Sequence, residues 1–265
     1  MSAPGTFLDV RDVGKAFGGL RALSHVSFSV ARGTIKAIIG PNGAGKTTLL
    51  NIIARLYEAD TGQVWLGNRR IDRLPPYRIV RLGVARTFQN LRLFADMTVL
   101  ENVMVGRYPR TRAGLAAALL RTRGQRAEER AIAERAWTLL GDVGLAEHAH
   151  EPAGSLPFGK QRLLEIARAL AADPMLLLLD EPAAGLNAAE AGALGAFIRR
   201  LRLSGVTTLL VEHHMELVME ISDEILVLNF GQALAEGPPE AIRTDPQVIQ
   251  AYLGDEAALA HDLRS

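Results

Sequence analysis

The nine residues from position 40 to position 48 constrain the fold of this chain more than any other stretch. They are Gly40, Pro41, Asn42, Gly43, Ala44, Gly45, Lys46, Thr47 and Thr48, and they match the pattern G-x-x-x-x-G-K-[ST]. An apolar, β-branched run at 34–39 precedes them and an apolar segment at 49–56 follows, so the pattern lies between a predicted strand and a predicted helix. Glycines let successive backbone N–H groups surround an anion, and the helix N-terminus adds its positive end. The stretch therefore predicts a phosphate-binding loop in an α/β fold, with Lys46 against the β- and γ-phosphates and Thr47 on Mg²⁺.

Length and composition limit the remaining choices. With 265 residues, 48% of them hydrophobic and 22% charged, the chain can form one large α/β domain or one domain with an inserted lobe. A net charge of +1 gives no strongly basic surface, which argues against nucleic acid as a partner. The chain has no cysteine, contains no run of 18 apolar residues and begins without a secretory signal pattern. These features predict a protein of the cytosol that does not itself cross a membrane.

The N-terminal part predicts an antiparallel β lobe. Apolar and polar residues alternate at 7–13 and at 24–30, as they do in half-buried antiparallel strands. The segment 15–20 between these runs is expected to be a loop. Its aromatic residue, Phe17, either stacks on an adenine ring or closes the core at the end of a strand.

An unusually apolar loop follows a short strand that we predict at 84–88 and that ends at Gln89. The loop contains four large apolar residues, Leu91, Leu93, Phe94 and Met97. Such a loop either packs under the core or forms a patch that binds a partner. Thr98 and Glu101 have the spacing of a capping box, which predicts that the next helix begins there.

The second half of the chain alternates predicted helices with buried strands. Alanine, leucine, arginine and glutamate dominate residues 107–141, which predicts an inserted α-helical subdomain spanning about 90–160. Continuous apolar runs at 175–179 and 206–211 are typical of parallel strands that are covered on both faces. The expected fold is therefore a mostly parallel core sheet with an N-terminal antiparallel β lobe and a helical insertion.

Two carboxylates, Asp180 and Glu181, come directly after the first of these apolar strands. Because desolvating a lone carboxylate costs free energy, a charge at so apolar a strand end requires a cation. Mg²⁺ on a bound nucleotide would supply it at Asp180, while Glu181 would point the other way and polarise an attacking water. His213 follows the next core strand and is expected to face the same phosphate.

Several further segments occur in the same order as these motifs. They are Leu156-Pro157-Phe158-Gly159-Lys160, Ala184-Gly185-Leu186-Asn187, the run from Ala85 to Phe94, and the ending Ala251-Tyr252-Leu253-Gly254. Taken with the loop at 40–48, this order resembles the ATP-binding subunits of ABC transporters over roughly residues 7–254. The run at 85–94 and the ending at 251–254 resemble in particular the subunits of high-affinity branched-chain amino acid importers.

This resemblance implies a role for each candidate residue at the nucleotide. Phe17 would stack on adenine, Gln89 would reach the Mg²⁺ and the attacking water, and His213 would contact the γ-phosphate. The segment Leu156, Pro157, Phe158, Gly159 and Lys160, here called the signature segment, would close over the ATP of an opposing subunit. Asn187 would lie at the seam of that dimer. The apolar loop from Leu91 to Met97 would line the groove that receives a short helix of a transmembrane permease.

The signature segment departs from the usual Leu-Ser-Gly-Gly-Gln of the family. Pro157 stands where a serine hydroxyl normally reaches the γ-phosphate, and such a charge-assisted contact is worth about 1.5–3 kcal/mol. Proline is compatible with the start of a helix, so we expect the helix itself to form. Lys160 either compensates with its positive charge or is an exposed side chain at the helix start.

The resemblance implies a subunit that binds ATP and Mg²⁺ and hydrolyses the ATP, powering uptake of branched-chain amino acids or related small polar solutes. Its partners would be permease subunits, a second copy or a related ATP-binding chain, and indirectly a solute-binding protein, at the cytoplasmic face of the inner membrane. We expect a flexible N-terminus at 1–6, one domain at 7–254 and a tail at 255–265. Two alternatives are a soluble ABC protein of DNA repair or translation, and a switch that binds nucleotide without hydrolysing it.

Overall fold

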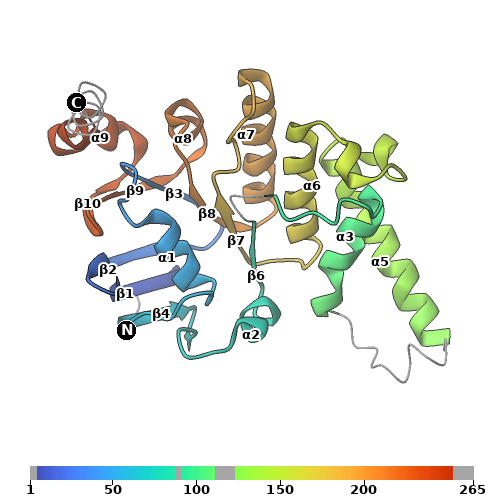
Figure 1. The fold of residues 1–265 in the computed structure, drawn as a ribbon, viewed down its shortest axis with the longest axis horizontal. Helices are drawn as coiled ribbons and strands as arrows, with labels where there is room; N and C mark the ends of the chain where they lie inside the picture. The colour runs from blue at the N-terminus through green and yellow to red at the C-terminus, as the bar shows by residue number, and fades with distance from the viewer. Residues whose placement is uncertain (1–4, 88–90, 111–122, 253–265) are drawn as a thin grey trace.

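The computed structural model describes residues 5–87, 91–110 and 123–252, which form two β-sheets and several helices (Figure 1). The N-terminal sheet is antiparallel and has the strand order β2-β1-β4-β5. Its strands are β1 (Thr6–Phe17), β2 (Leu20–Ala31), β4 (Thr61–Leu66) and β5 (Arg69–Arg70). The predicted antiparallel β lobe is therefore confirmed.

The second sheet runs through the middle of the molecule and has the order β10-β9-β3-β8-β7-β6. Its strands are β3 (Ile35–Ile39), β6 (Val84–Arg86), β7 (Leu176–Asp180), β8 (Thr207–Val211), β9 (Glu224–Asn229) and β10 (Gln232–Gly237). All neighbouring pairs from β9 to β6 are parallel, and only the edge strand β10 is antiparallel. The mostly parallel core sheet is thus confirmed.

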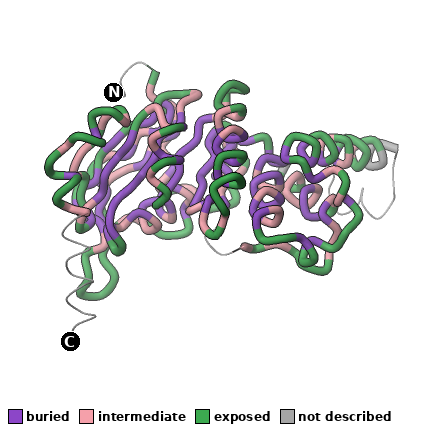
Figure 2. Tube along the Cα trace, turned by 90° about the horizontal axis from the view of Figure 1, so that it is seen from above, coloured by how far each residue is buried: buried purple, intermediate pink, exposed green. Residues whose placement is uncertain are grey.

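Burial on both faces explains the continuous apolar runs of the core strands. In β7, Leu176 and Leu178 pack into a cluster with the N-terminal sheet and the helix after the predicted phosphate loop. Leu177 and Leu179 alternate with them and pack into a second cluster with the other helices. Successive side chains of a strand point to opposite faces, so a strand covered twice needs an apolar residue at every position. Figure 2 shows the resulting buried interior, with exposed residues on the outer sides of the helices.

The helices cover the core sheet, and some of them form a separate group beyond one edge of it. They are α1 (Lys46–Ile53), α2 (Pro76–Arg81), α3 (Val99–Arg107), α5 (Arg123–Asp142), α6 (Phe158–Leu170), α7 (Ala188–Leu203), α8 (Met215–Ile221) and α9 (Pro239–Thr244), with 3₁₀ turns η1 (Tyr108–Arg110), η2 (Ala146–His148) and η3 (Ala153–Ser155). Helices α3, α5 and α6 pack together beyond β6 and β7, at the opposite end of the molecule from β10 (Figure 1). They form the inserted helical part of the fold. Among the described residues, no helix combines the length and apolarity needed to cross a bilayer.

Two helices begin with a capping box. Thr98 accepts from the backbone N–H of Glu101, whose side chain accepts from the backbone N–H of Thr98, so the capping box at α3 is confirmed. Asn187 and Glu190 make the equivalent pair at α7. Each box satisfies N–H groups that a helix start leaves without intrahelical partners.

Two predicted boundaries were wrong. The segment 15–20 is not a loop: β1 continues through Phe17, β2 begins at Leu20, and only Gly18 and Gly19 turn the chain between them. The helix predicted at 49–56 begins earlier, at Lys46, and ends at Ile53. In the first case the two strands pair to their ends, an interaction between distant residues that the local pattern does not reveal.

A buried lysine joins the two sheets. Lys36 lies on β3 and is only 1% exposed. Its Nζ donates to the carbonyl of Ser29 on β2 at 2.7 Å and to Glu224 Oε2 on β9 at 2.9 Å, and it also contacts Glu236 on β10. The ammonium thus connects four strands, which explains why a charged residue is tolerated in so apolar a strand.

Candidate functional site

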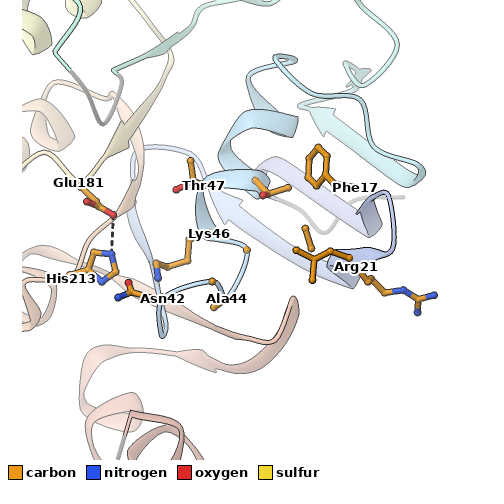
Figure 3. A pocket seen from close by; sticks show the side chains of 13 residues that line it. Phe17, Arg21, Asn42, Ala44, Lys46, Thr47, Glu181 and His213 are labelled. Carbon is orange, nitrogen blue, oxygen red and sulfur yellow. Dashed lines mark hydrogen bonds and ion pairs between the residues drawn. The ribbon is translucent and has the colours of Figure 1, made fainter. Parts of the chain in front are cut away.

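A pocket of about 420 Å³ lies where the two sheets meet (Figure 3). The predicted phosphate loop contributes residues 42–48, and the paired ends of β1 and β2 contribute Phe17, Leu20, Arg21 and Ala22. Glu181 and His213 enter from the carboxyl ends of β7 and β8. The structure therefore brings Phe17, most of the predicted loop, Glu181 and His213 to one pocket. Arg21 points away from the other labelled side chains in Figure 3.

The loop has the backbone shape that its glycines allow. Gly40 has φ = 146°, and a Cβ at this position would lie 2.0 Å from the carbonyl oxygen of Leu228. Gly45 has φ = 99° and directly precedes α1, which has no side-chain cap. The first backbone N–H groups of a helix lack intrahelical acceptors, so the uncapped start of α1 offers donors to an anion in the pocket.

Lys46 places a cation beside these donors. Its side chain is buried, and Nζ donates to the carbonyl of Gly40 at 2.6 Å and to that of Pro41 at 2.7 Å. The carbonyl groups of Gly40 and Pro41 therefore accept hydrogen bonds from Lys46, and the two residues do not themselves line the pocket. An ammonium, a helix N-terminus and a glycine loop together make an environment suited to phosphate.

Glu181 and His213 lie side by side on one wall of the pocket, with their side chains pointing toward each other, as Figure 3 shows. His213 Nε2 lies 2.9 Å from Glu181 Oε1, and because a carboxylate only accepts, the imidazole N–H is the donor. Glu181 has φ = 48°, a left-handed conformation that is strained for a residue with a side chain. Its backbone N–H donates to the carbonyl of Val211 at the end of β8.

Glu212, which we did not single out from the sequence, fixes this side of the pocket. It is 2% exposed, and its carboxylate accepts from the backbone N–H of Ala183 at 2.6 Å and from that of His213 at 3.0 Å. The buried carboxylate thus ties the loop after β7 to the loop after β8. Its place directly before His213 was visible in the sequence, but its partner was not.

Asp180 lies behind Glu181, almost fully buried at 1% exposure. Its Oδ2 accepts from Arg86 Nη2 at 2.9 Å, and its Oδ1 has no partner among the described residues. Burial raises the pKa of Asp180 above its ordinary value, and the Arg86 guanidinium counteracts part of that rise. Arg86 also donates through Nη1 to Asn51 on α1 at 2.6 Å.

The carboxylate oxygen Oδ1 of Asp180 and the hydroxyl of Thr47 are suitable ligands for a magnesium ion. The buried Oδ1 of Asp180 needs a partner, and the Thr47 hydroxyl stands at the start of α1 on the pocket wall. A carboxylate and a hydroxyl are the hard oxygen ligands that Mg²⁺ prefers, completed by water and phosphate oxygens. The third predicted ligand, Gln89, lies outside the described residues.

Phe17 forms the opposite wall and remains 43% exposed, so it does not close the core. Tyr57 packs edge-on against its ring at a centroid distance of 5.4 Å, and Lys15 Nζ lies 5.3 Å from the ring centroid. Neither neighbour was expected from the sequence. Together they hold the partly exposed ring at the pocket wall.

The signature segment and Asn187 lie away from the pocket of their own chain. Pro157 is the N-cap of α6, so the helix forms as expected. Phe158 packs against Gly185 in the loop before α7, and a Cβ on Gly159 would come within 2.7 Å of Glu190 in the first turn of α7. Lys160 is half-buried and donates to His148 Nε2 at 2.6 Å, so it is not a freely exposed side chain.

The apolar loop after the short strand is divided between the core and the surface. Leu93 packs against the large helical cluster, and Leu91 and Met97 are half-buried. Phe94 is 49% exposed and lines a second cavity of about 380 Å³. Arg86, Arg92 and Arg168 line the same cavity, which we call the arginine groove.

Comparison with known proteins agrees with this geometry. The family model described as ABC transporter matches residues 23–184, and a model described as branched-chain amino acid ATP-binding cassette transporter matches residues 234–258. The high-affinity branched-chain amino acid transport ATP-binding protein LivG of Escherichia coli is 46% identical over 96% of this chain and 100% of its own length.

Solved structures agree in fold as well. The ADP conformation of MJ1267, an ATP-binding cassette of an ABC transporter, superposes with a TM-score of 0.81 at 32% identity, covering 94% of this chain and 99% of that one. The dimeric post-hydrolysis state of the cassette MJ0796, bound to ADP and Pi, gives a TM-score of 0.75 at 25% identity over 88% and 98% of the two chains. The chain belongs to the ABC transporter family, in which it is an ATP-binding cassette that hydrolyses ATP.

Proposed function

We propose that this chain binds MgATP in the 420 Å³ pocket and hydrolyses it to drive uptake of branched-chain amino acids through a membrane permease. The observation that carries the proposal is that Lys46, Glu181 and His213 line one pocket, with Glu181 and His213 in hydrogen-bond contact. A cation and helix N-terminus on one wall, and a carboxylate held by an imidazole on the other, are the groups that phosphoryl transfer to water requires.

The pocket would hold the nucleotide from both ends. The backbone N–H groups of residues 42–48 and the Lys46 ammonium would bind the phosphates, while the adenine would stack on Phe17. Thr47, Asp180 and Gln89 would hold Mg²⁺, which neutralises charge on the phosphates. The volume lies within the range of about 300–1,000 Å³ that is usual for small-molecule sites.

Glu181 would orient and polarise the attacking water. His213 holds the Glu181 carboxylate from one side in the structure, so the side chain is directed before substrate arrives. In the loaded site His213 would also reach the γ-phosphate. General base catalysis of this kind contributes typically 10²- to 10⁴-fold to a rate.

A second copy, or a related ATP-binding chain, would complete the site. The signature segment and Asn187 are described in the structure but line no part of the pocket of their own chain. They would instead cover the ATP of the opposing subunit, an arrangement supported by the dimeric cassette that is similar in fold. ATP would then hold two subunits together until hydrolysis removes the γ-phosphate contacts.

The permease would dock beside the helical part of the fold. Phe94 is the exposed member of the predicted contact set, whereas Leu91, Leu93 and Met97 are half-buried. The similarity to LivG favours branched-chain amino acids as the cargo, delivered by a solute-binding protein, with the chain bound at the cytoplasmic face of the inner membrane. Related small polar solutes are the second choice of cargo.

The proposal is tested in two steps. Calorimetry with ATP and an assay of phosphate release, on the purified chain, should give binding and hydrolysis that Lys46→Ala abolishes. Uptake of radiolabelled leucine, in a bacterium lacking its own high-affinity importer ATPase but carrying the chain and its neighbouring permease genes, should fail with Glu181→Gln and persist with Glu220→Gln. ATP binding without phosphate release, with or without permease, would instead favour the non-hydrolysing switch.

A further inference from the structure

Arg86 joins three elements around the proposed nucleotide site. It lies on β6, and its side chain is only 7% exposed. One nitrogen, Nη1, donates to Asn51 Oδ1 on α1 at 2.6 Å, and another, Nη2, donates to Asp180 Oδ2 at the end of β7 at 2.9 Å. The planar guanidinium therefore holds a fixed spacing between the helix that follows the phosphate loop and the carboxylate behind Glu181.

The partner on α1 lies on the face that carries a predicted metal ligand. Asn51 and Thr47 are four residues apart in α1, so they lie one above the other on the same side of the helix. The hydrogen bond to Asn51 therefore fixes the position of the guanidinium relative to the turn that carries the Thr47 hydroxyl. The hydrogen bond from its other nitrogen fixes the position of Asp180 relative to the same guanidinium.

The contact also determines how Asp180 presents its second oxygen. With Oδ2 fixed by Arg86, rotation of the carboxylate is blocked, and Oδ1 is left buried without a partner among the described residues. Stability alone is a weak reason for this arrangement, because replacing a buried ion pair by apolar residues is often neutral or stabilising. A charge pair that leaves one oxygen of a predicted magnesium ligand without a partner among the described residues is better explained by the orientation it imposes.

We propose that Arg86 is a positioning residue of the ATP site: by tying Asp180 to the Thr47 face of α1, it sets the geometry in which the chain holds the metal of MgATP. The proposal rests on the proposed function. Arg86 also lines the arginine groove, so a permease segment docked there would touch the group that aligns Asp180.

The test measures metal-dependent nucleotide affinity and needs no turnover. ADP binding to the purified chain is followed by calorimetry in Mg²⁺ and in EDTA, and Mn²⁺ binding to the ADP complex is followed by electron paramagnetic resonance. Arg86→Ala should weaken Mn²⁺ binding and the Mg²⁺-dependent gain in ADP affinity by about tenfold, as loss of an outer-shell group does. ADP affinity in EDTA should remain unchanged, because the phosphate loop is intact.

Three further variants, one of them double, separate positioning from simple loss of charge. Asn51→Ala should reproduce the effect while leaving Arg86 and Asp180 paired, and the double variant should be no worse than Arg86→Ala, since both remove one linkage. Arg86→Lys should recover part of the affinity, because its ammonium keeps a positive charge beside Asp180 but lacks the planar fork that spans Asn51 and Asp180. The control, Arg199→Ala, breaks a surface pair with Glu220 and should leave every value unchanged.

Three results would overturn the inference. The first is an unchanged metal dependence in folded Arg86→Ala, and the second is an equal loss of affinity in Mg²⁺ and EDTA. The third is additive effects of the Arg86 and Asn51 substitutions. A wild-type chain that binds no ADP would instead contradict the proposed function, and with it the inference that depends on it.

Discussion

Glu181 is held by its backbone as much as by its side chain. Its left-handed φ of 48°, its backbone hydrogen bond to Val211 and the contact from His213 act on the same residue. Strain of this kind persists only where the surroundings determine the conformation, and it concentrates at functional sites. The direction of the carboxylate is therefore set by the fold before any nucleotide is bound.

Replacing this residue gives the first prediction. Glu181→Gln keeps the size and the hydrogen-bonding capacity of the side chain but removes the base, so phosphate release should fall at least about a hundredfold. ATP affinity should remain within about twofold, because the phosphate loop is untouched. Phosphate release and calorimetry test this, with Glu220→Gln as a surface control. Normal turnover in Glu181→Gln would remove Glu181 from its proposed role.

Among the elements, Lys36 adds a polar link between the two sheets to the apolar cluster that they share. Its ammonium is buried, whereas its partners Glu224 and Glu236 are about half exposed, with side chains 54% and 39% accessible. The pairs are therefore screened by water on one side, whereas the hydrogen bond to the carbonyl of Ser29 joins Lys36 directly to β2.

The second prediction concerns this connection. Lys36→Ala should lower the free energy of unfolding by about 2–3 kcal/mol, since it removes charged hydrogen bonds and opens a cavity between β2 and β3. Lys36→Met, which fills the same space without the charge, should recover part of the loss. Urea denaturation of both variants measures the difference. Equal stability of Lys36→Ala and the wild type would contradict the connecting role.

The third prediction is a pH dependence at the hairpin of β4 and β5. Burial raises the pKa of Asp72, but the Arg70 fork and the Val64 backbone N–H lower it by more, so the net shift is downward. An acid with a lowered folded-state pKa contributes stability that is present above its unfolded pKa and lost as the pH falls through the folded value. Asp72→Asn should therefore lose stability near pH 6 and approach the wild type below pH 4.

Thermal unfolding of both proteins between pH 3 and pH 6 gives the comparison. The difference in melting temperature should be nearly constant between pH 5 and pH 6 and should shrink as the pH falls below about 4. A difference that stays constant over this range would mean that Asp72 acts through its shape and not through its charge.

The sequence predicted elements best where the signal is local. The buried strands were found from continuous apolar runs such as Leu176–Leu179, and the start of α3 from the spacing of Thr98 and Glu101. The end of β1 at Phe17 was missed, because it depends on pairing with Leu20 across a two-residue turn.

The same distinction holds at the site. Lys46, Asp180 and Glu181 belong to contiguous motifs and were identified from them. Arg86 and Glu212 act through partners that lie 94 and 29 residues away, so their roles follow from sheet register and loop contacts. No local pattern encodes those distances, since they depend on the assembled fold.

At the scale of the whole molecule, each proposed ATP site in the dimer needs two chains. One chain supplies the phosphate loop of one site and the signature segment of the other. The phosphate loop lies where the sheets meet, whereas the signature segment begins α6 in the helical part (Figure 1). Moving such an assembly from 1:99 to 99:1 in favour of the closed state takes about 5.5 kcal/mol of differential binding. Two γ-phosphates with several charge-assisted bonds each can supply it even without a serine at position 157.

The fourth prediction tests the cost of that missing serine. Pro157→Ser adds a hydroxyl at the N-cap of α6, so it should tighten the ATP-bound dimer of a Glu181→Gln chain by at least about tenfold. Pro157→Ala changes the backbone in the same way without the hydroxyl and should not. Sedimentation velocity across a range of protein concentrations measures both. Equal dimer affinities for the serine and alanine variants would place the segment away from the γ-phosphate.

The central claim, a triphosphate held by residues 42–48 opposite Glu181 and His213, is tested most directly by a crystal structure of the Glu181→Gln chain grown with MgATP. The account predicts the β- and γ-phosphates against the backbone N–H groups of the loop and Lys46, the adenine on Phe17, and the metal within reach of Thr47 and Asp180. A nucleotide bound elsewhere, with the loop empty, would contradict it.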